Sequence, residues 1–161
     1  MFQVGDKISY PMHGAGRVEG IEEKEVLGNV GMYYVIYFYC DGMKVMIPVD
    51  RAEAAGLRPV IREEEVQNVF DYLSDELESE ALSNWNRRYR FNLEKLREGN
   101  IYSIAEVAKA LSARHNERGL SAGEKKMLAS ARRYLLGELY LAGGGSEEEL
   151  SSRLDACLGG L

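Results

Sequence analysis

The sequence predicts an α+β protein with two domains, a small β domain followed by a bundle of about five α-helices. From Asp6 to Pro48 the chain is rich in Tyr, Val and Ile and is interrupted by many glycines, which is typical of short strands joined by tight turns. After Pro59 apolar residues recur at helical spacing instead. A chain of 161 residues is long enough for two small domains, which we place at 1–58 and 59–161.

The β half contains two apolar segments, MYYVIYFYC at 32–40 and KVMIPV at 44–49. LGNVG at 27–31 and CDGM at 40–43 supply the Asn, Asp and Gly residues that hairpin turns favour. Four or five strands in so short a segment are too few for a large sandwich. We therefore predict a small, strongly bent SH3-like or Tudor-like barrel, with AEAAGLRPV at 52–60 as the connection to the second half.

The helical half carries three sequences in which a serine is followed three residues later by a glutamate, a pattern that can cap a helix start. They are Ser103 with Glu106, Ser121 with Glu124, and Ser146 with Glu149. Two apolar stripes follow at helical spacing, Ile104, Val107, Ala108 and Leu111 in one and Leu128, Ala131, Leu135 and Leu139 in the other. Two further helices are predicted at 63–74 and 84–97, which brings the bundle to about five.

Charge is distributed unevenly along the chain. The formal net charge of −6 argues against a protein that coats nucleic acid unselectively, because that behaviour needs a broad excess of Lys and Arg. Residues 62–80 contain one base and eight acids, whereas residues 84–133 contain twelve bases and five acids. The basic part therefore predicts either a local positive patch on an acidic body or simply a set of solvated helix faces.

Motifs for catalysis, metals and cofactors are missing from the sequence. HGAG at 13–16 and GGGS at 143–146 lack the Gly-Lys-Ser/Thr ending of a phosphate loop, and we interpret both as turns. His13 and His115 have no His or Cys neighbour at ligand spacing, and two distant cysteines cannot build a four-ligand metal site. We expect a non-enzymatic protein with no cofactor and no metal.

The chain also lacks signals for a membrane. No segment approaches the roughly 18 uninterrupted apolar residues of a membrane helix. MFQVGDKISY at 1–10 has neither the basic start nor the apolar block of a signal peptide. We therefore expect a cytoplasmic protein without a membrane partner.

The segment SNWNRRYRF at 83–91 holds the single tryptophan of the chain beside a cluster of arginines. Trp85, Tyr89, Leu93 and Leu96 have the spacing of a helix core stripe, on which Trp85 would simply be buried. In the first turn of a helix, however, the indole can also project beyond the bundle. An aromatic ring among arginines can insert at a base step or stack on an exposed base while the cations hold the backbone. Spacing alone leaves both interpretations open.

Several long motifs in a fixed order carry a family resemblance across nearly the whole chain. They are GDKISYPMHGAGRVEGIE at 5–22, NWNRRYR at 84–90, IAEVAKAL at 104–111 and ERGLSAGEKKMLASAR at 117–132. With them the sequence resembles the CarD/CdnL family of bacterial RNA polymerase-binding transcription regulators. The resemblance implies a Tudor-like N-terminal domain that docks on the polymerase β subunit, a domain type shared with the transcription-repair coupling factor. It also implies a helical domain that touches promoter DNA.

The resemblance further implies roles for single residues. Trp85 matches the family tryptophan that wedges into the minor groove at the upstream edge of the melted promoter bubble. Basic positions near the DNA backbone are matched by Arg87, Arg88, Arg90 and Lys125. On the polymerase side the matching positions are Lys24, Lys44 and Met46. Some relatives have an arginine where this chain has Met46, so we expect polymerase contact here to depend more on apolar packing and strand pairing than on an ion pair.

Two other functional classes follow from the same residues. A protein-only adaptor would use the barrel to bind a partner and the helices as a spacer, with no salt-dependent DNA contact. A small enzyme would need convergent polar groups in a pocket, and the sequence offers no triad or cofactor loop. We expect a monomer, with dimerisation through an exposed strand edge as the alternative.

Overall fold

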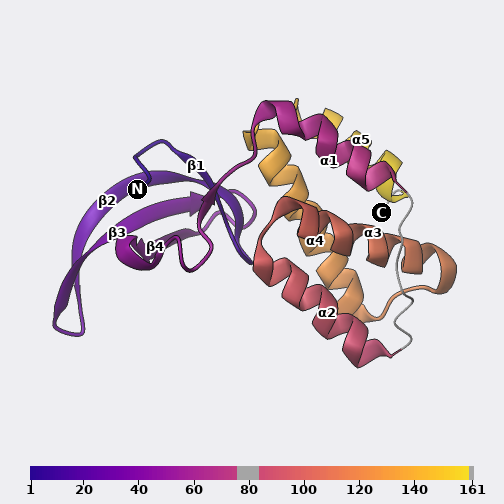
Figure 1. Ribbon diagram of the computed structural model, residues 1–161, viewed down its shortest axis with the longest axis horizontal. Coiled ribbons are helices and arrows are strands. Elements are labelled where there is room, and N and C mark those ends of the chain that lie inside the picture. Colours follow the sequence, from indigo (N-terminus) through magenta and orange to yellow (C-terminus); the bar gives the residue numbers. More distant parts are fainter. Residues whose placement is uncertain (76–83, 160–161) are drawn as a thin grey trace.

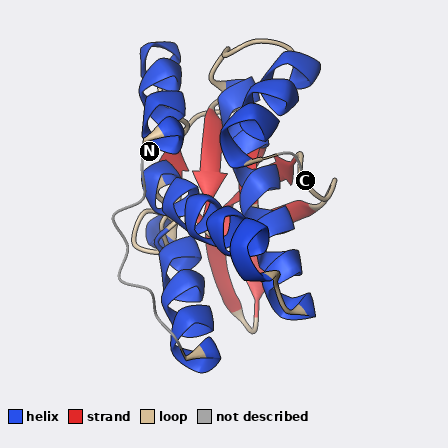
Figure 2. Ribbon diagram, turned by 90° about the vertical axis from the view of Figure 1, so that its right-hand side faces the viewer, coloured by secondary structure: helices blue, strands red, loops and turns tan. Residues whose placement is uncertain are grey.

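The computed structural model describes residues 1–75 and 84–159. Within them an antiparallel sheet of five strands is followed by five α-helices, as Figure 1 shows. The sheet and the bundle lie side by side along the long axis of the molecule. In Figure 2, where the bundle faces the viewer, the helices stand in front of the strands. The predicted α+β class is confirmed.

The sheet has the order β4-β3-β2-β1-β5. Its strands are β1 (Lys7–Tyr10), β2 (Gly14–Val26), β3 (Asn29–Phe38), β4 (Lys44–Pro48) and β5 (Arg58–Pro59). β2 and β3 form a long hairpin that bends at an irregularity between Val18 and Gly20, which lets the sheet curve around its own core. Ile8, Val18, Tyr34, Ile36 and Phe38 are buried in one hydrophobic core.

The hairpin turns fall in the predicted segments, but one of them differs in detail. Asn29 pairs with Val26 in the strands, so the loop of the first hairpin consists of Leu27 and Gly28. Both residues have positive φ, 52° and 80°, as a type I′ turn requires. The turn therefore lies in the predicted segment, with Gly28 in the loop and Asn29 already in the strand, because strand register decides which two residues form the loop.

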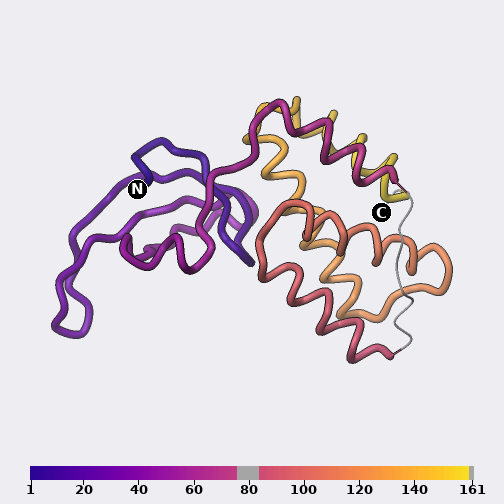
Figure 3. The backbone as a smooth tube through the Cα atoms, viewed as in Figure 1, coloured from indigo at the N-terminus to yellow at the C-terminus, as the bar shows by residue number. Residues whose placement is uncertain are grey.

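The five helices are α1 (Val66–Ser74), α2 (Trp85–Glu98), α3 (Ile101–Arg118), α4 (Ala122–Leu141) and α5 (Glu147–Leu158). Short 3-10 turns at Val49–Arg51 and Glu63–Glu65 complete the described elements. The predicted apolar stripes of α3 and α4 are buried in one core. Figure 3 shows α5 running beside α1, so the last helix closes the bundle against the first. In the described part of the chain no helix combines the length and apolarity needed to cross a bilayer.

The predicted helix starts are right at two of three places. Ser121 and Glu124 form a complete capping box at α4, and Ser146 caps α5 by accepting from the backbone N–H of Glu149. The start at Ser103 was wrong. Asn100 caps α3 instead, two residues after α2 has ended, because Gly99 adopts a left-handed conformation that stops one helix and lets the next begin at once.

A buried ion pair joins the sheet to the bundle. Arg58 of β5 donates to both carboxylate oxygens of Glu138 on α4, at 2.6 and 2.7 Å, and Glu138 is 1% exposed. Arg58 also donates to the carbonyl oxygen of Gly99, between α2 and α3, and the N–H of Ile61 donates to Glu138. Three separate parts of the chain are therefore linked by one arginine.

Beside this pair α4 lies close against the start of β2. A side chain at Gly14 would come within 2.9 Å of the Tyr134 ring, and the Tyr134 hydroxyl donates to the carbonyl oxygen of Met12. The Cys40 thiol and Ala15 lie against Gly137 at ordinary contact distance. Small residues on both surfaces thus allow the helix to approach the strand.

Replacing Glu138 by Gln should test the importance of this junction. Because the substitution leaves Arg58 without its buried counter-charge, we expect the free energy of unfolding to fall by about 3 kcal/mol. Urea unfolding followed by circular dichroism measures the change. Glu19→Gln serves as the control, since the Glu19–Lys44 pair is exposed and its loss should cost less than about 1 kcal/mol. Equal losses in both variants would contradict a special role for the junction.

Candidate nucleic-acid interface

Trp85 is the first residue of α2. Asn84 caps this helix with its side-chain oxygen, which accepts from the backbone N–H groups of Asn86 and Arg87. The cap fixes where the first turn of α2 starts. It therefore determines where the indole leaves the bundle.

The side chain of Trp85 is 43% exposed, whereas Leu96 on the same stripe is 3% exposed. Tyr89 and Leu93 lie between them and are partly buried against the core. Burial therefore increases along the stripe from Tyr89 to Leu96, and Trp85 lies outside the core. The interpretation of Trp85 as a core residue is not supported by this exposure.

The indole is held by contacts on two sides. Its Nε1–H donates to the hydroxyl of Ser121 at 3.0 Å, and its ring is stacked on Tyr89 with centroids 5.1 Å apart and an interplanar angle of 19°. Gly123 of α4 lies against both rings. Residues 36 positions apart in sequence are therefore in direct contact, between the first turns of α2 and α4.

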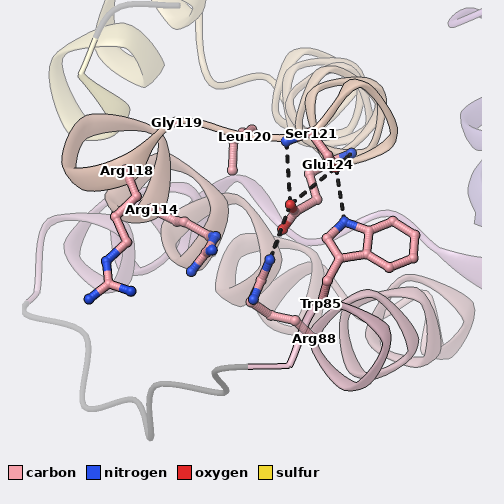
Figure 4. A pocket seen from close by; sticks show the side chains of 8 residues that line it. All are labelled: Trp85, Arg88, Arg114, Arg118, Gly119, Leu120, Ser121 and Glu124. Carbon is pink, nitrogen blue, oxygen red and sulfur yellow. Dashed lines mark hydrogen bonds and ion pairs between the residues drawn. The ribbon is translucent and has the colours of Figure 1, made fainter.

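Arg88 lies one turn further along α2 and is largely buried. Its Nε donates to Oε2 of Glu124 at 3.1 Å, and a second guanidinium nitrogen donates to Oε1 at 3.3 Å. The side chains of Arg88 and Glu124 are 12% and 2% exposed. Figure 4 shows this ion pair beside the Trp85–Ser121 hydrogen bond. Of the four predicted DNA-side cations, Arg88 is thus the one engaged with a buried carboxylate.

The pKa of Glu124 is lower than its ordinary value of 4.5. Burial alone would raise this pKa, but the hydrogen bonds from Arg88 and Ser121 and the positive charge of Arg88 together outweigh burial. Glu124 is therefore ionised at neutral pH. The carboxylate also accepts from the Ser121 hydroxyl at 3.1 Å, so the ion pair and the helix cap share one group.

A shallow hollow of about 440 Å³ opens next to the indole. It is lined by Trp85, Arg88, Arg114, Arg118, Gly119, Leu120, Ser121 and Glu124. Arg114 and Arg118 come from the end of α3, and sequence reasoning counted them among the basic residues without assigning them to a site. Arg114 and Arg118 are four residues apart on α3, and this helix ends shortly before Ser121. That spacing places both side chains on one face near the start of α4, and it was the signal from which the sequence could have assigned them to the site.

The remaining predicted DNA-side residues lie on the surface of the same two helices. Arg87 and Arg90 of α2 are exposed, and so is Lys125 of α4. The backbone N–H of Lys125 donates to the carbonyl of Ser121. Lys125 therefore lies one helical turn after Ser121, the residue to which the indole N–H donates. The fold therefore brings Lys125 into the neighbourhood of the indole.

The predicted polymerase-side residues lie on the sheet. Lys24 belongs to β2, and its Nζ is 3.3 Å from the sulfur of Met46 on β4. Lys44, also on β4, pairs with Glu19 at 3.1 Å and remains mostly exposed. Among the described strands β4 pairs only with β3, so one side of β4 is a free edge.

Among the described residues, no group of three or more His, Cys, Asp or Glu side chains could hold a metal ion. The interface is instead built from cations and aromatic rings. Such groups can bind phosphate and stack on bases.

The Arg88–Glu124 pair should make stability depend on pH. Since the folded-state pKa of Glu124 is lowered, its stabilising contribution is complete above about pH 4.5 and is lost as the pH falls through the folded-state value. Glu124→Gln should therefore be less stable than the wild-type protein at pH 7, and the difference should shrink below pH 4.5. Urea unfolding at a series of pH values measures it. A difference that stays constant over this range would contradict the assignment.

A curated protein matches this chain over nearly the whole length of both. The chain is 40% identical over 155 residues to YdeB of Bacillus subtilis (strain 168), which carries a provisional designation as a transcription factor; the match covers 94% of this chain and 99% of the relative. The solution structure of the 72-residue N-terminal domain of Myxococcus xanthus CarD is 36% identical, with a TM-score of 0.32. It covers 37% of this chain and 79% of that domain.

Two family models together match almost the whole chain. The model described as "CarD-like/TRCF RID domain" matches residues 2–61, and the model described as "CarD, C-terminal domain" matches residues 68–155. The first match coincides with the five strands and the second with the helices. The chain belongs to the CarD-like family of transcription factors, which are non-enzymatic regulators linked to RNA polymerase.

Proposed function

We propose that this protein docks on the β subunit of RNA polymerase and stabilises the open promoter complex through Trp85. In this proposal the indole wedges into the minor groove at the upstream edge of the melted bubble, and cations beside it hold the DNA backbone. The observation that carries the proposal is the half-exposed indole at the start of α2, next to a hollow lined by arginines. Residues 1–58 would serve the polymerase and residues 59–161 the DNA.

The mechanism is a shift of equilibrium and requires no catalysis. A factor that binds the melted complex more tightly than the closed complex favours opening by that difference in affinity. Inserting a ring into intact duplex costs a few kcal/mol of unstacking, on the order seen for minor-groove wedges, and costs less where the DNA is already distorted. The protein would therefore recognise shape rather than base sequence.

We propose two different roles for the four cations. Arg87, Arg90 and Lys125 are exposed and would contact the DNA backbone directly. Arg88 lies against Glu124, so we assign it the additional task of holding the wedge region together while its charge faces the hollow. Since the net charge of the chain is −6, binding to free DNA should be weak and salt-sensitive.

Polymerase docking would supply the high local concentration that makes this weak contact effective. We propose that the docking surface includes Lys24, Lys44 and Met46. Two features favour it, the free edge of β4 and the contact of Lys24 with the Met46 sulfur. An exposed edge strand can pair with a strand of a partner, and Met46 adds apolar surface beside it. The same edge is the surface through which a dimer would form, although we propose a monomer.

Trp85→Ala should shorten the lifetime of the open complex by about tenfold, because base–aromatic stacking contributes on the order of 1–3 kcal/mol. Stability should fall by no more than about 2 kcal/mol, since the side chain is half exposed. The lifetime is measured on purified polymerase–promoter complexes challenged with a competitor. Binding to polymerase alone is the control and should not change. An unchanged lifetime would contradict the wedge.

Arg90→Gln and Lys125→Gln should each weaken binding to the polymerase–promoter complex and reduce the slope of log affinity against log salt by about 1, because each removes one phosphate contact. Lys7→Gln, an exposed change on the barrel, is the matched control. Unchanged slopes for both variants would favour the protein-only adaptor.

A further inference from the structure

We propose that Ser121 is a positioning residue that holds the Trp85 indole in a single orientation before DNA is bound. The inference rests on the proposed function, because it concerns how the wedge is prepared for insertion. Ser121 is the N-cap residue of α4 and lies outside the segment that carries the tryptophan. No motif of the sequence links the two residues.

The hydroxyl of Ser121 uses its full hydrogen-bonding capacity. A serine hydroxyl has one hydrogen to donate and two lone pairs that accept. Here it donates to Oε1 of Glu124 at 3.1 Å and accepts from the backbone N–H of Glu124 at 3.2 Å and from Nε1–H of Trp85 at 3.0 Å. Because its only hydrogen points to a carboxylate, the oxygen is directed to accept from the indole.

The carboxylate that orients this hydroxyl is itself fixed. Glu124 is 2% exposed and receives two hydrogen bonds from Arg88. Arg88 and Trp85 are three residues apart on α2, and Glu124 lies three residues after the N-cap Ser121 of α4. The four side chains therefore form a closed ring of hydrogen bonds and helix neighbours between the two helices. Turning the indole away would break the hydrogen bond that the Ser121 hydroxyl accepts from Nε1–H and would open this ring.

A second contact removes the remaining freedom of the indole. The ring lies on Tyr89 at 5.1 Å with 19° between the planes. One hydrogen bond at the indole nitrogen and one stacked face together restrict both side-chain torsions. The exposed 43% of the side chain is then presented in a constant direction, and the entropy of ordering it is lost on folding rather than on binding.

The competing explanation is that Ser121 only caps α4. The chain offers a matched control for this explanation in Ser146, whose hydroxyl accepts from the backbone N–H of Glu149 at 3.1 Å and caps α5 in the same way. Ser146→Ala removes a helix cap without touching Trp85. Ser121→Thr retains a hydroxyl that can both cap the helix and accept from the indole.

The orientation can be measured in the free protein, since Trp85 is the single tryptophan of the chain. We expect time-resolved fluorescence anisotropy to show faster local motion of the indole in Ser121→Ala than in the wild-type protein. Ser121→Thr and Ser146→Ala should retain the wild-type decay. Equal decays for Ser121→Ala and wild type would overturn the proposal, whatever the protein does on DNA.

Open-complex lifetimes then test the functional consequence in a double-mutant cycle. Ser121→Ala should shorten the lifetime roughly three- to tenfold in the wild-type background, the effect of losing one hydrogen bond. It should have no further effect in a Trp85→Phe background, because phenylalanine stacks but has no N–H to donate. Equal shortening in both backgrounds would mean that Ser121 acts only through the helix. If Trp85→Ala leaves the lifetime unchanged, the proposed function fails, and the anisotropy result still decides the role of Ser121.

Discussion

The arrangement of this molecule depends on the ion pair between Arg58 and Glu138. A carboxylate that is 1% exposed is costly to bury unless its charge and its oxygens are fully engaged. Arg58 engages both oxygens, the Ile61 N–H adds a third hydrogen bond, and the same guanidinium reaches the Gly99 carbonyl. β5, α4 and the α2–α3 junction can satisfy all of these groups together only in one relative position. The pair therefore determines where the bundle lies relative to the sheet.

α4 carries this constraint to the end of the bundle where Trp85 lies. Its second buried carboxylate, Glu124, lies fourteen residues before Glu138, which is about four helical turns. One end of α4 is thus joined to β5 through Arg58 and the other to α2 through Arg88. A single rigid helix connects the proposed polymerase-binding sheet with the proposed wedge. If both proposals hold, the position of Trp85 relative to polymerase is a property of the folded chain rather than of a flexible linker.

Much of the fold was predictable because it depends on local chemistry. Apolar residues at helical spacing predicted α3 and α4, and the Ser121–Glu124 pair predicted the start of α4 correctly. The errors have a common cause. Ser103 has the residues of a capping box, but Asn100 and the left-handed Gly99 start the helix earlier. The first hairpin places Leu27 at a positive φ, because the strand register leaves no other residue for that position. In both places neighbouring residues compete to form the helix start or the turn. A single sequence motif carries no information about that competition.

For the candidate site, the sequence by itself determined the residue types: an aromatic ring at a helix start, a cluster of arginines around it and the family to which the motifs belong. The tertiary structure decided which of these groups are available and which are engaged. Spacing could not tell that Trp85 stays half exposed, that Arg88 lies against Glu124, or that Arg114, Arg118 and Ser121 come to the same place. The physical reason is that burial and pairing of charge depend on helices far apart in sequence. Those helices meet only when the core of the bundle has formed.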